Sequence, residues 1–267
     1  MSEPIELKIL SGVHGRFLAY ENDLITRQIE QFGAHTRNEI AFLCCAVEPG
    51  DRIIDLGAHI GTFTVPLARK AGPTGRVLAI EANLVTFSLL QVNMHLNELA
   101  SRVQCLNTAV GVEGARAAAM TMSPGNSGSA RFSFGEGAVR FSSLRRVMAA
   151  NDIERPDVIK MDVEGMEGMI LEDIAPMLAE VRPVLYFEVA LTLKKNGTDP
   201  SELRARLASL GYRLFRNVGQ RNSANDSFTV VEMDKMPEGD RIFDCLAIPR
   251  DSARVGQFAE AHPGTSR

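Results

Sequence analysis

The sequence has little of what several classes of protein require. It contains no tryptophan and has four cysteines, at positions 44, 45, 105 and 245, without any C-x-x-C pair. This spacing predicts neither a zinc site nor a disulfide framework, and free thiols are typical of a reducing compartment. Lysine and arginine number 29 against 33 aspartates and glutamates, so the net charge is −4. A chain without excess positive charge is not expected to bind nucleic acid.

The chain also has no apolar stretch long enough to span a bilayer, and Met1–Leu7 has neither the basic nor the apolar region of a signal peptide. We therefore expect a cytoplasmic protein without a membrane partner. Its 267 residues, 45% of them hydrophobic, are enough for one large α/β domain or two small ones. No pattern decides the oligomeric state, and a homo-oligomer is compatible with the sequence.

Short apolar strands alternate with amphipathic helices through most of the chain. This alternation predicts an α/β fold with a doubly wound, mostly parallel sheet and helices on both faces. We divide the chain into an N-terminal extension with a helical cap (1–48), a main domain (49–250) and a flexible tail (251–267). Within the main domain, residues 111–142 are rich in Gly, Ser and Ala and predict a hairpin or loop insertion. A long loop inside a compact domain is usually functional.

Residues 52–63 predict a strand, a tight turn and the start of a helix. Gly57 and Gly61 allow positive φ and the close approach of a ligand, and the free N–H groups of the helix favour a negatively charged group. His59 stands where a dinucleotide fingerprint needs glycine, and no P-loop Gly-Lys-Ser/Thr follows. The pattern Asp-x-Gly-x-x-x-Gly, which begins at Asp55, resembles motif I of class I S-adenosylmethionine (SAM) methyltransferases. An ordinary βα turn is the alternative.

Glu81 ends the second predicted strand, 24 residues after Gly57. A carboxylate near this spacing is typical of one that accepts hydrogen bonds from ribose hydroxyls in a nucleoside-binding sheet. The alternative is a glutamate that caps the helix beginning near Asn83. If the strand order starts 3-2-1-4-5, Glu81 lies beside the crevice where the order reverses, which is the expected ligand site.

Carboxylates gather at the end of the fourth predicted strand, at Asp162, Glu164 and Glu167. Their mutual repulsion is costly unless they bind the ammonium group of the donor or a divalent cation, or accept the proton of a substrate hydroxyl. The alternative is helix capping, because acids are favourable at a helix N-terminus. Glu188 ends the fifth strand and is expected at the same rim. No histidine stands near these acids in sequence, so a metal bound there would have only oxygen ligands, as Mg²⁺ prefers.

Together these segments resemble the FkbM family of SAM-dependent methyltransferases, from about Ile53 to Val189. The segments that carry the resemblance are Asp55–Gly61, Ala79–Asn83, Leu90–Asn93 with Asn97, Asn107–Gly111, Ile159–Glu167 and Arg182–Glu188. The pattern Lys-x-Asp-x-Glu-Gly-x-Glu from Lys160, followed by the Arg-Pro strand, is the most specific part. The family usually has Asn in place of His59 and Pro in place of Ala82, and neither departure changes the chemistry of the turn.

The resemblance implies a class I Rossmann-like fold with a seven-stranded sheet, and methyl transfer from SAM, most often to a hydroxyl of a sugar or secondary metabolite. We expect catalysis from Asp162, Glu164 and Glu188, with an acid accepting the hydroxyl proton. His59 either contacts the donor carboxylate or is a structural substitute for Asn. The residues expected to bind the cofactor are Asp55, Gly57, Ala58, His59, Gly61, Glu81, Ala82, Asn107, Thr108, Asp162 and Glu39.

Two segments outside these motifs are expected to complete the site. Pro124–Arg131 in the insertion is predicted to be a lid or an acceptor-recognition loop, with Asn126 and Ser127 as hydrogen-bonding residues. Thr36 and Glu39, in the N-terminal extension, are expected to close over the methionine end of the donor.

Two other functions are alternatives to methyl transfer. A SAM-binding protein without methyl transfer, such as an aminopropyl transferase or a regulatory module, fits the acidic stretch 162–167 loosely. However, aromatic residues make up only 6% of the chain, so few could enclose a polyamine. A nicotinamide-dependent oxidoreductase is disfavoured because G-x-G-x-x-G and Tyr-x-x-x-Lys are both missing. We therefore predict a SAM-dependent methyltransferase with a small-molecule acceptor.

Overall fold

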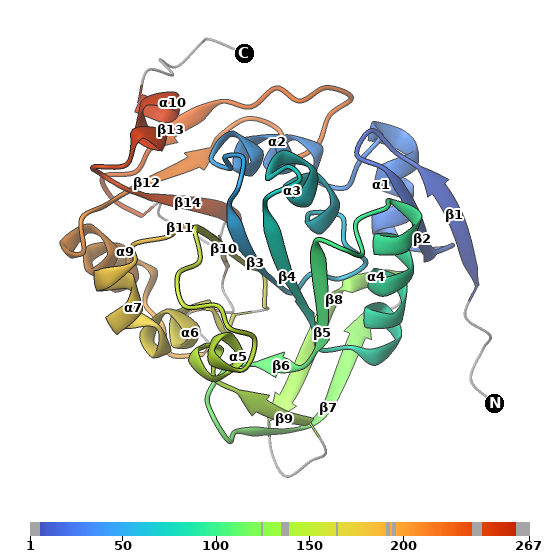
Figure 1. Ribbon diagram of the computed structural model, residues 1–267, viewed down its shortest axis with the longest axis horizontal. Helices are drawn as coiled ribbons and strands as arrows, with labels where there is room; N and C mark the ends of the chain where they lie inside the picture. Colours follow the sequence, from blue (N-terminus) through green and yellow to red (C-terminus); the bar gives the residue numbers. More distant parts are fainter. Residues whose placement is uncertain are drawn as a thin grey trace.

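A central sheet forms the middle layer of the computed structural model (Figure 1). The structure describes residues 6–123, 125–134, 139–163, 165–190, 193, 196–236 and 242–259. Within these ranges the sheet has eight strands in the order β13-β12-β14-β11-β10-β3-β4-β5. Their bounds are β3 Arg52–Leu56, β4 Arg76–Glu81, β5 Val103–Asn107, β10 Val158–Met161, β11 Val184–Val189, β12 Tyr212–Asn217, β13 Val230–Glu232 and β14 Phe243–Pro249.

The strand order confirms the predicted doubly wound, mostly parallel sheet. β5, β4, β3, β10 and β11 pair in parallel, whereas β14 is antiparallel to both β11 and β12. Chain order reverses between β3 and β10, as the order 3-2-1-4-5 requires. β13 is an addition to the seven strands expected. It pairs with β12 through three residues at the edge of the sheet, and so short a segment shows no recognisable alternation.

Helices cover both faces of the sheet because the strands are apolar on both. Ile53 and Ile54 are consecutive, so they point to opposite faces, and each joins a separate core cluster. The Ile53 cluster contains residues of α2, α3 and α4, and the Ile54 cluster contains residues of α5, α6, α7 and α9. These helices are α2 Arg37–Cys45, α3 Thr64–Lys70, α4 Leu84–Leu96, α5 Leu144–Ala150, α6 Glu167–Asp173, α7 Ala175–Glu180 and α9 Pro200–Ser209.

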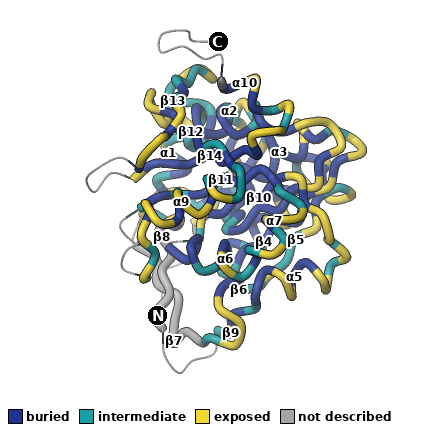
Figure 2. Tube along the Cα trace, turned by 90° about the vertical axis from the view of Figure 1, so that its left-hand side faces the viewer, coloured by how far each residue is buried: buried dark blue, intermediate teal, exposed yellow. Residues whose placement is uncertain are grey.

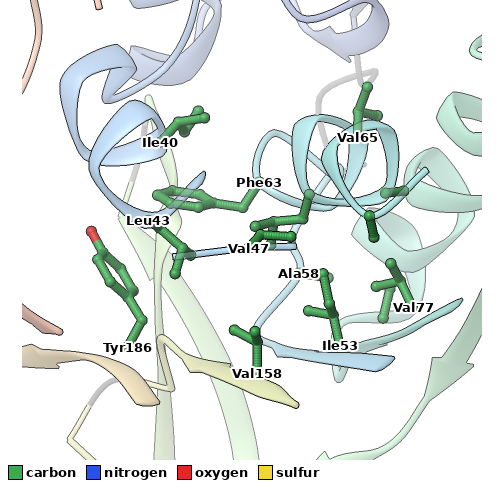
Figure 3. Packing of buried hydrophobic residues seen from close by; sticks show 14 of the residues in the cluster. Ile40, Leu43, Val47, Ile53, Ala58, Phe63, Val65, Val77, Val158 and Tyr186 are labelled. Atoms are coloured by element: carbon green, nitrogen blue, oxygen red, sulfur yellow. The ribbon is translucent and has the colours of Figure 1, made fainter. Parts of the chain in front are cut away.

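Figure 3 shows part of the first cluster, in which Ile53 and Val158 of the sheet lie beneath Leu43 and Phe63. Figure 2 shows the central strands buried along most of their length, with exposed residues concentrated in the outer turns. No helix in the described ranges has the length and apolar character that a bilayer span requires.

The N-terminal extension folds against α4. β1 (Leu7–Ser11) and β2 (Arg16–Tyr20) form an antiparallel hairpin, and α1 (Leu24–Phe32) follows. The Asn93 amide of α4 pairs with the backbone of β2: its oxygen accepts from the N–H of Leu18 at 2.6 Å, and its nitrogen donates to the Leu18 oxygen at 3.1 Å. The same nitrogen donates to the Ile60 oxygen at 2.8 Å. Asn93 therefore joins the extension to the turn after β3.

The insertion contains a hairpin, as expected. β7 (Arg116–Ser123) and β8 (Asn126–Phe134) pair antiparallel, and β9 (Val139–Ser142) pairs with both β7 and β6 (Ala109–Val110). These strands form a separate small sheet beside the central one (Figure 1).

The expectation of a flexible tail from residue 251 needs correction for its first part. Ala253–Val255 forms a 3₁₀ turn, and α10 (Gly256–Ala259) follows it. Val255 and Phe258 are buried in the same cluster as Ile53. The tail residues 260–267 lie outside the described part of the chain. Val255 and Phe258 are two large apolar residues in an otherwise small and polar segment. This pattern is too short to predict a helix from the sequence.

We expect Asn93→Ala to destabilise the protein by about 2–4 kcal/mol, because it leaves backbone groups of Leu18 and Ile60 without their partners. Chemical denaturation measures the change in the free energy of unfolding. Ser88→Ala is the control, because this exposed side chain of α4 donates to the Leu84 oxygen of its own helix, and it should change the free energy of unfolding by less than about 0.5 kcal/mol. Equal effects of the two substitutions would contradict the anchoring role of Asn93.

Candidate active site

A cavity of about 560 Å³ lies at the carboxyl ends of β3, β4 and β10, where the strand order reverses. Topology predicts a ligand site at this position. The lining includes these residues from the sequence analysis: Gly57, Ala58, His59, Glu81, Ala82, Thr108, Asp162 and Glu188.

Gly57 and Gly61 shape the turn after β3 through the positive φ that the sequence predicts and through close contacts within the protein. Both have positive φ, 71° and 92°. A Cβ atom on Gly57 would lie 1.9 Å from the backbone oxygen of Asp162, and one on Gly61 would lie 2.7 Å from Cε of Met94. The glycines therefore make room for neighbouring parts of the protein rather than for a ligand. Gly61 is not among the residues that line the cavity.

Asp55 lies beneath the turn and does not line the cavity, in contrast to its expected place at the cofactor. It is fully buried, its carboxylate lies 3.0 Å from Nζ of Lys160, and it accepts a hydrogen bond from Oγ1 of Thr64 at 2.7 Å. The Asp55 carboxylate thus interacts with Lys160 and Thr64 of the protein itself. Asp55 therefore supports the turn from below.

Lys160 connects this carboxylate to the turn itself. Its Nζ donates to the backbone oxygens of Leu56 at 3.3 Å and Gly57 at 2.8 Å. Burial alone would lower the pKa of Lys160, but the charges of Asp55 and Asp162 outweigh burial and raise it. Lys160 consequently stays protonated, and its charge holds the end of β3 against β10.

Glu81 lies at the end of β4 and is almost fully buried. One carboxylate oxygen accepts from the N–H of His59 at 2.9 Å, and the other accepts from the N–H of Asn83 at 2.8 Å. Burial raises the pKa of this carboxyl, and the two backbone N–H groups oppose part of the rise. Because each carboxylate oxygen has two acceptor positions, both oxygens keep one position for a ligand.

The helix-capping alternative for Glu81 is not what the structure shows. Asn83 caps α4, since its side-chain oxygen accepts from the N–H groups of Val85 and Thr86. Asn107, expected at the cofactor, is not among the lining residues. It donates to the backbone oxygens of Glu81 and Ala82 and so fixes the loop after β4.

His59 stands in the left-handed region, with φ 51°. Asn and His are enriched in that region among residues other than glycine, which explains how His replaces the Asn typical of similar sequences. Its ring is buried at the cavity wall, both ring nitrogens are buried and lack a hydrogen-bond partner within the described residues, and burial lowers its pKa to about 4. The imidazole is therefore neutral at pH 7.

The three acids proposed for catalysis have different surroundings. Asp162 is exposed to the cavity, and Glu188 lines it with a carboxylate oxygen 3.8 Å from the guanidinium of Arg221. Glu164 lies outside the described part of the chain. Asp162 and Glu188 can therefore meet a ligand in this cavity.

Glu167 has a structural environment. Its carboxylate is buried, accepts from the N–H of Val163 at 3.0 Å, and is not among the lining residues. Burial raises its pKa to about 7. Glu167 stands in the first turn of α6, where an acid is favourable, but its hydrogen bond to Val163 goes to the loop before the helix and does not cap it.

Glu39 also lies outside the cavity lining, contrary to its expected contact with the donor. It is buried in α2, where it accepts from the hydroxyl of Tyr186 at 3.1 Å and from the amide of Asn217 at 2.9 Å. Burial and the nearby charge of Asp244 raise its pKa to about 7. Glu39 joins α2 to the sheet behind the cavity wall.

Sequence reasoning missed His35, Arg221 and Asn222, which also line the cavity. Their two loops are far apart in the chain, and they meet because the N–H of Arg37 donates to the Asn222 side-chain oxygen at 3.0 Å across 185 positions. Arg221 pairs with Asp244 at 2.7 Å. No local pattern marks such residues, because their position depends on long-range pairing.

No group of three or more His, Cys, Asp and Glu side chains in the described residues is close enough together to hold a metal ion. Asp162 and Glu188, considered above for a divalent cation, both line the cavity without forming such a group.

Comparison with known proteins finds a match to a protein family. The family described as "Methyltransferase FkbM domain" matches residues 55–214, which is more than half of the chain. No curated protein matches the sequence.

Several solved structures are similar to this chain. One is M. jannaschii TYW2 in complex with AdoMet, with 16% identity, 93% of this chain and 89% of that chain covered, and a TM-score of 0.46. Another is a SAM-dependent O-methyltransferase from Thermotoga maritima, with 16% identity, 90% and 76% covered, and a TM-score of 0.45. A third is methyltransferase FkbM from Methylobacillus flagellatus, with 19% identity, 74% and 43% covered, and a TM-score of 0.44. These values are too low to carry an argument about site or substrate.

Lys160→Met should destabilise the protein by about 3–5 kcal/mol, because it leaves the buried Asp55 carboxylate without its cation. Arg155→Met removes the exposed pair with Glu180 and serves as the control, with an expected loss of about 0–1 kcal/mol. Denaturation curves of both variants give the comparison. If the double variant Asp55→Asn/Lys160→Met is no more stable than Lys160→Met, the destabilisation does not come from an unpaired carboxylate.

Glu167→Gln tests the cost of burying a carboxyl. Its folded-state pKa of about 7 exceeds the usual 4.5, so between these values the folded protein keeps a proton that the unfolded chain has lost. This contribution to stability is present at low pH and is lost as pH rises through 7. Glutamine keeps an acceptor oxygen without the charge. The free energy of unfolding of the variant, relative to that of wild type, should therefore rise by on the order of 2 kcal/mol from about pH 5 to pH 8. Denaturation of both proteins at each pH measures this gain, and a stability difference independent of pH contradicts it.

Proposed function

This chain belongs to the FkbM methyltransferase family, and we propose that it transfers the methyl group of SAM to a hydroxyl of a small molecule, such as a sugar or a secondary metabolite. The proposal combines the family with the cavity at the carboxyl ends of β3, β4 and β10. A volume of about 560 Å³ falls within the range typical of ligand sites.

The Glu81 carboxylate is the observation that carries the proposal. It lies in the cavity, is held in place by the N–H groups of His59 and Asn83, and keeps an acceptor position on each oxygen. Two such positions suit the two hydroxyls of a ribose, and hydrogen bonds to a charged acceptor are the stronger kind. The residues present therefore fit the nucleoside part of SAM. Ala58, His59, Ala82 and Thr108 would surround the rest of the donor.

Methyl transfer requires alignment and the removal of one proton. When bound, SAM supplies a methyl group on a positively charged sulfur. Holding the acceptor oxygen in line with that methyl contributes up to about 7–11 kcal/mol to the lowering of the barrier. We assign the proton to Asp162 or Glu188, which line the cavity. Glu164, the third acid of the sequence prediction, lies outside the described residues.

A small acceptor fits this cavity better than a nucleic acid. Of the cations among the lining residues of the described chain, Lys160 is paired with Asp55, and Arg221 is paired with Asp244. A polyanion needs unpaired positive charges along its path, and the chain as a whole has a net charge of −4.

Calorimetric titration of SAM and of its demethylated product tests the donor site. We expect wild type to bind both ligands and Glu81→Ala to bind at least about 100-fold more weakly, because two charge-assisted hydrogen bonds are lost. Glu81→Gln, which keeps the shape and one acceptor oxygen, should lie between them. Glu180→Ala, at an exposed acid on α7, is the matched control and should bind as wild type does.

Either failure of this experiment has a definite meaning. If wild type does not bind SAM, the proposed function is wrong. If it binds SAM but mass spectrometry detects no methylated product from a panel of sugars and hydroxylated metabolites, a SAM-binding protein without methyl transfer becomes the better interpretation.

A further inference from the structure

Besides the two ring nitrogens of His59, three polar side-chain atoms of residues that line the cavity are buried and have no hydrogen-bond partner within the described residues. They are Oγ of Ser127, Oγ1 of Thr36 and Nδ2 of Asn222. An unsatisfied buried polar group costs about 1–3 kcal/mol, so three around one cavity require an explanation. A bound ligand that supplies their hydrogen bonds would remove this cost.

Thr36 stands where its hydroxyl would ordinarily cap α2. Its backbone is left-handed, with φ 45° and ψ 47°, and its side chain makes no capping hydrogen bond. A capping residue normally has extended backbone, and a β-branched residue in the left-handed region is strained. Such strain in a structure is often found at functional sites. The hydroxyl of Thr36 is consequently left without a hydrogen-bond partner within the described residues.

Asn222 takes over part of the capping role. Its side-chain oxygen accepts from the N–H of Arg37, the first residue of α2, at 3.0 Å. This hydrogen bond determines which end of the amide is oxygen, because only the oxygen can accept. The nitrogen must then lie on the other side, where it is buried and unpartnered. The hydrogen bond to Arg37 thus orients the side-chain nitrogen of Asn222, which has no acceptor among the described residues.

Ser127 is held in place through its backbone. It lies at the tip of the hairpin β7–β8, and its N–H donates to the buried carboxylate of Asp23 at 2.6 Å. The N–H of Leu24 donates to the Gly125 oxygen at 2.9 Å. The tip of the insertion is therefore attached to the start of α1, and the position of the Ser127 hydroxyl does not depend on its own hydrogen bonds.

The three groups belong to segments outside the central sheet. Thr36 and Asn222 adjoin each other through Arg37. They come from the N-terminal extension, the insertion and the loop after β12, whereas Glu81, Ala82 and Thr108 come from the loops that follow β4 and β5. We call Thr36, Ser127 and Asn222 the roof triad.

The charges around the roof triad favour an uncharged ligand. Arg221, next to Asn222, lies 2.7 Å from Asp244 and 3.8 Å from Glu188, so its charge is already compensated. Burial lowers the pKa of His35 to about 3 and that of His59 to about 4, and both imidazoles are neutral. An anionic group would find no unpaired cation among these described residues.

We propose that the roof triad binds hydroxyl and ether oxygens of an uncharged, polyhydroxylated acceptor, and thereby determines which acceptors are methylated. This inference rests on the proposed function, because it needs the donor at the Glu81 side. Two hydroxyls that both donate and accept, together with one amide donor, match a ligand with several oxygens pointing in different directions. Thr36 and Asn222 lie outside residues 55–214, so the family match assigns them no role.

Three substitutions each remove one group and keep its structural contact. Ser127→Ala retains the N–H on Asp23, and Thr36→Val retains the branched shape. Asn222→Asp retains the oxygen that caps α2 while removing the donor. Ser88→Ala, an exposed hydroxyl outside the cavity, is the matched control. Thermal unfolding of all four checks that each variant folds.

The probes are methyl α-D-glucopyranoside, methyl α-D-galactopyranoside and methyl α-L-rhamnopyranoside, titrated by ligand-observed NMR into protein saturated with the demethylated donor. We expect at least one glycoside to bind wild type, and each triad variant to weaken that binding about tenfold, as the loss of a hydrogen bond to a buried group predicts. SAM affinity, measured separately by calorimetry, should change less than about twofold in folded variants.

Three outcomes overturn the inference. None of the glycosides binds while SAM does; the triad variants bind the glycoside as Ser88→Ala does; or the variants lose SAM affinity instead, which would place the three groups at the donor. Failure of wild type to bind SAM is a different result, because it overturns the proposed function itself.

Discussion

The contact between the end of β3 and the end of β10 holds the turn from which one wall of the cavity is built. The two strands are neighbours at the reversal of strand order, and the turn after β3 passes so close to β10 that a Cβ on Gly57 would lie 1.9 Å from the Asp162 oxygen. Lys160 holds this contact from within the sheet, since its charge is paired with Asp55 and its protons reach the Leu56 and Gly57 oxygens. One buried cation therefore determines the shape of the turn.

The same contact brings the site together. With the turn held against β10, the N–H of His59 meets the Glu81 carboxylate at the end of β4, and Asp162 faces the cavity beside them. Asp55 thus acts beneath the cavity, whereas Lys160, Glu81 and Asp162 line it. Some residues of one sequence pattern therefore support the site, and others can contact a ligand. The burial and hydrogen bonds of each residue decide between the two roles.

The other side of the cavity is built by segments that the sheet does not control. The N-terminal extension is attached to α4 through Asn93, the tip of the insertion is attached to α1 through Asp23, and the loop after β12 is attached to α2 through Asn222. Each attachment is a side-chain carboxylate or amide that pairs with backbone groups of a distant segment. These attachments bring residues from outside the central sheet to the cavity.

Local signals in the sequence predict the doubly wound sheet and a candidate site at its strand ends: apolar strands buried on both faces, a glycine turn and an acid at a strand end. The strand order is an assumption at that stage, and the structure establishes it. Tertiary structure alone decided which polar residues reach the cavity. Asp55, Gly61, Asn107 and Glu39 belong to the expected motifs or segments but do not line it, because Lys160, Met94, the loop after β4 and Tyr186 occupy their surroundings. His35, Arg221 and Asn222 do line it without any local signal, since contacts across as many as 185 positions bring them there. Periodicity and turn chemistry depend on a few neighbouring residues. Whether a polar side chain is buried or lines the cavity depends instead on its contacts with residues far away in the sequence.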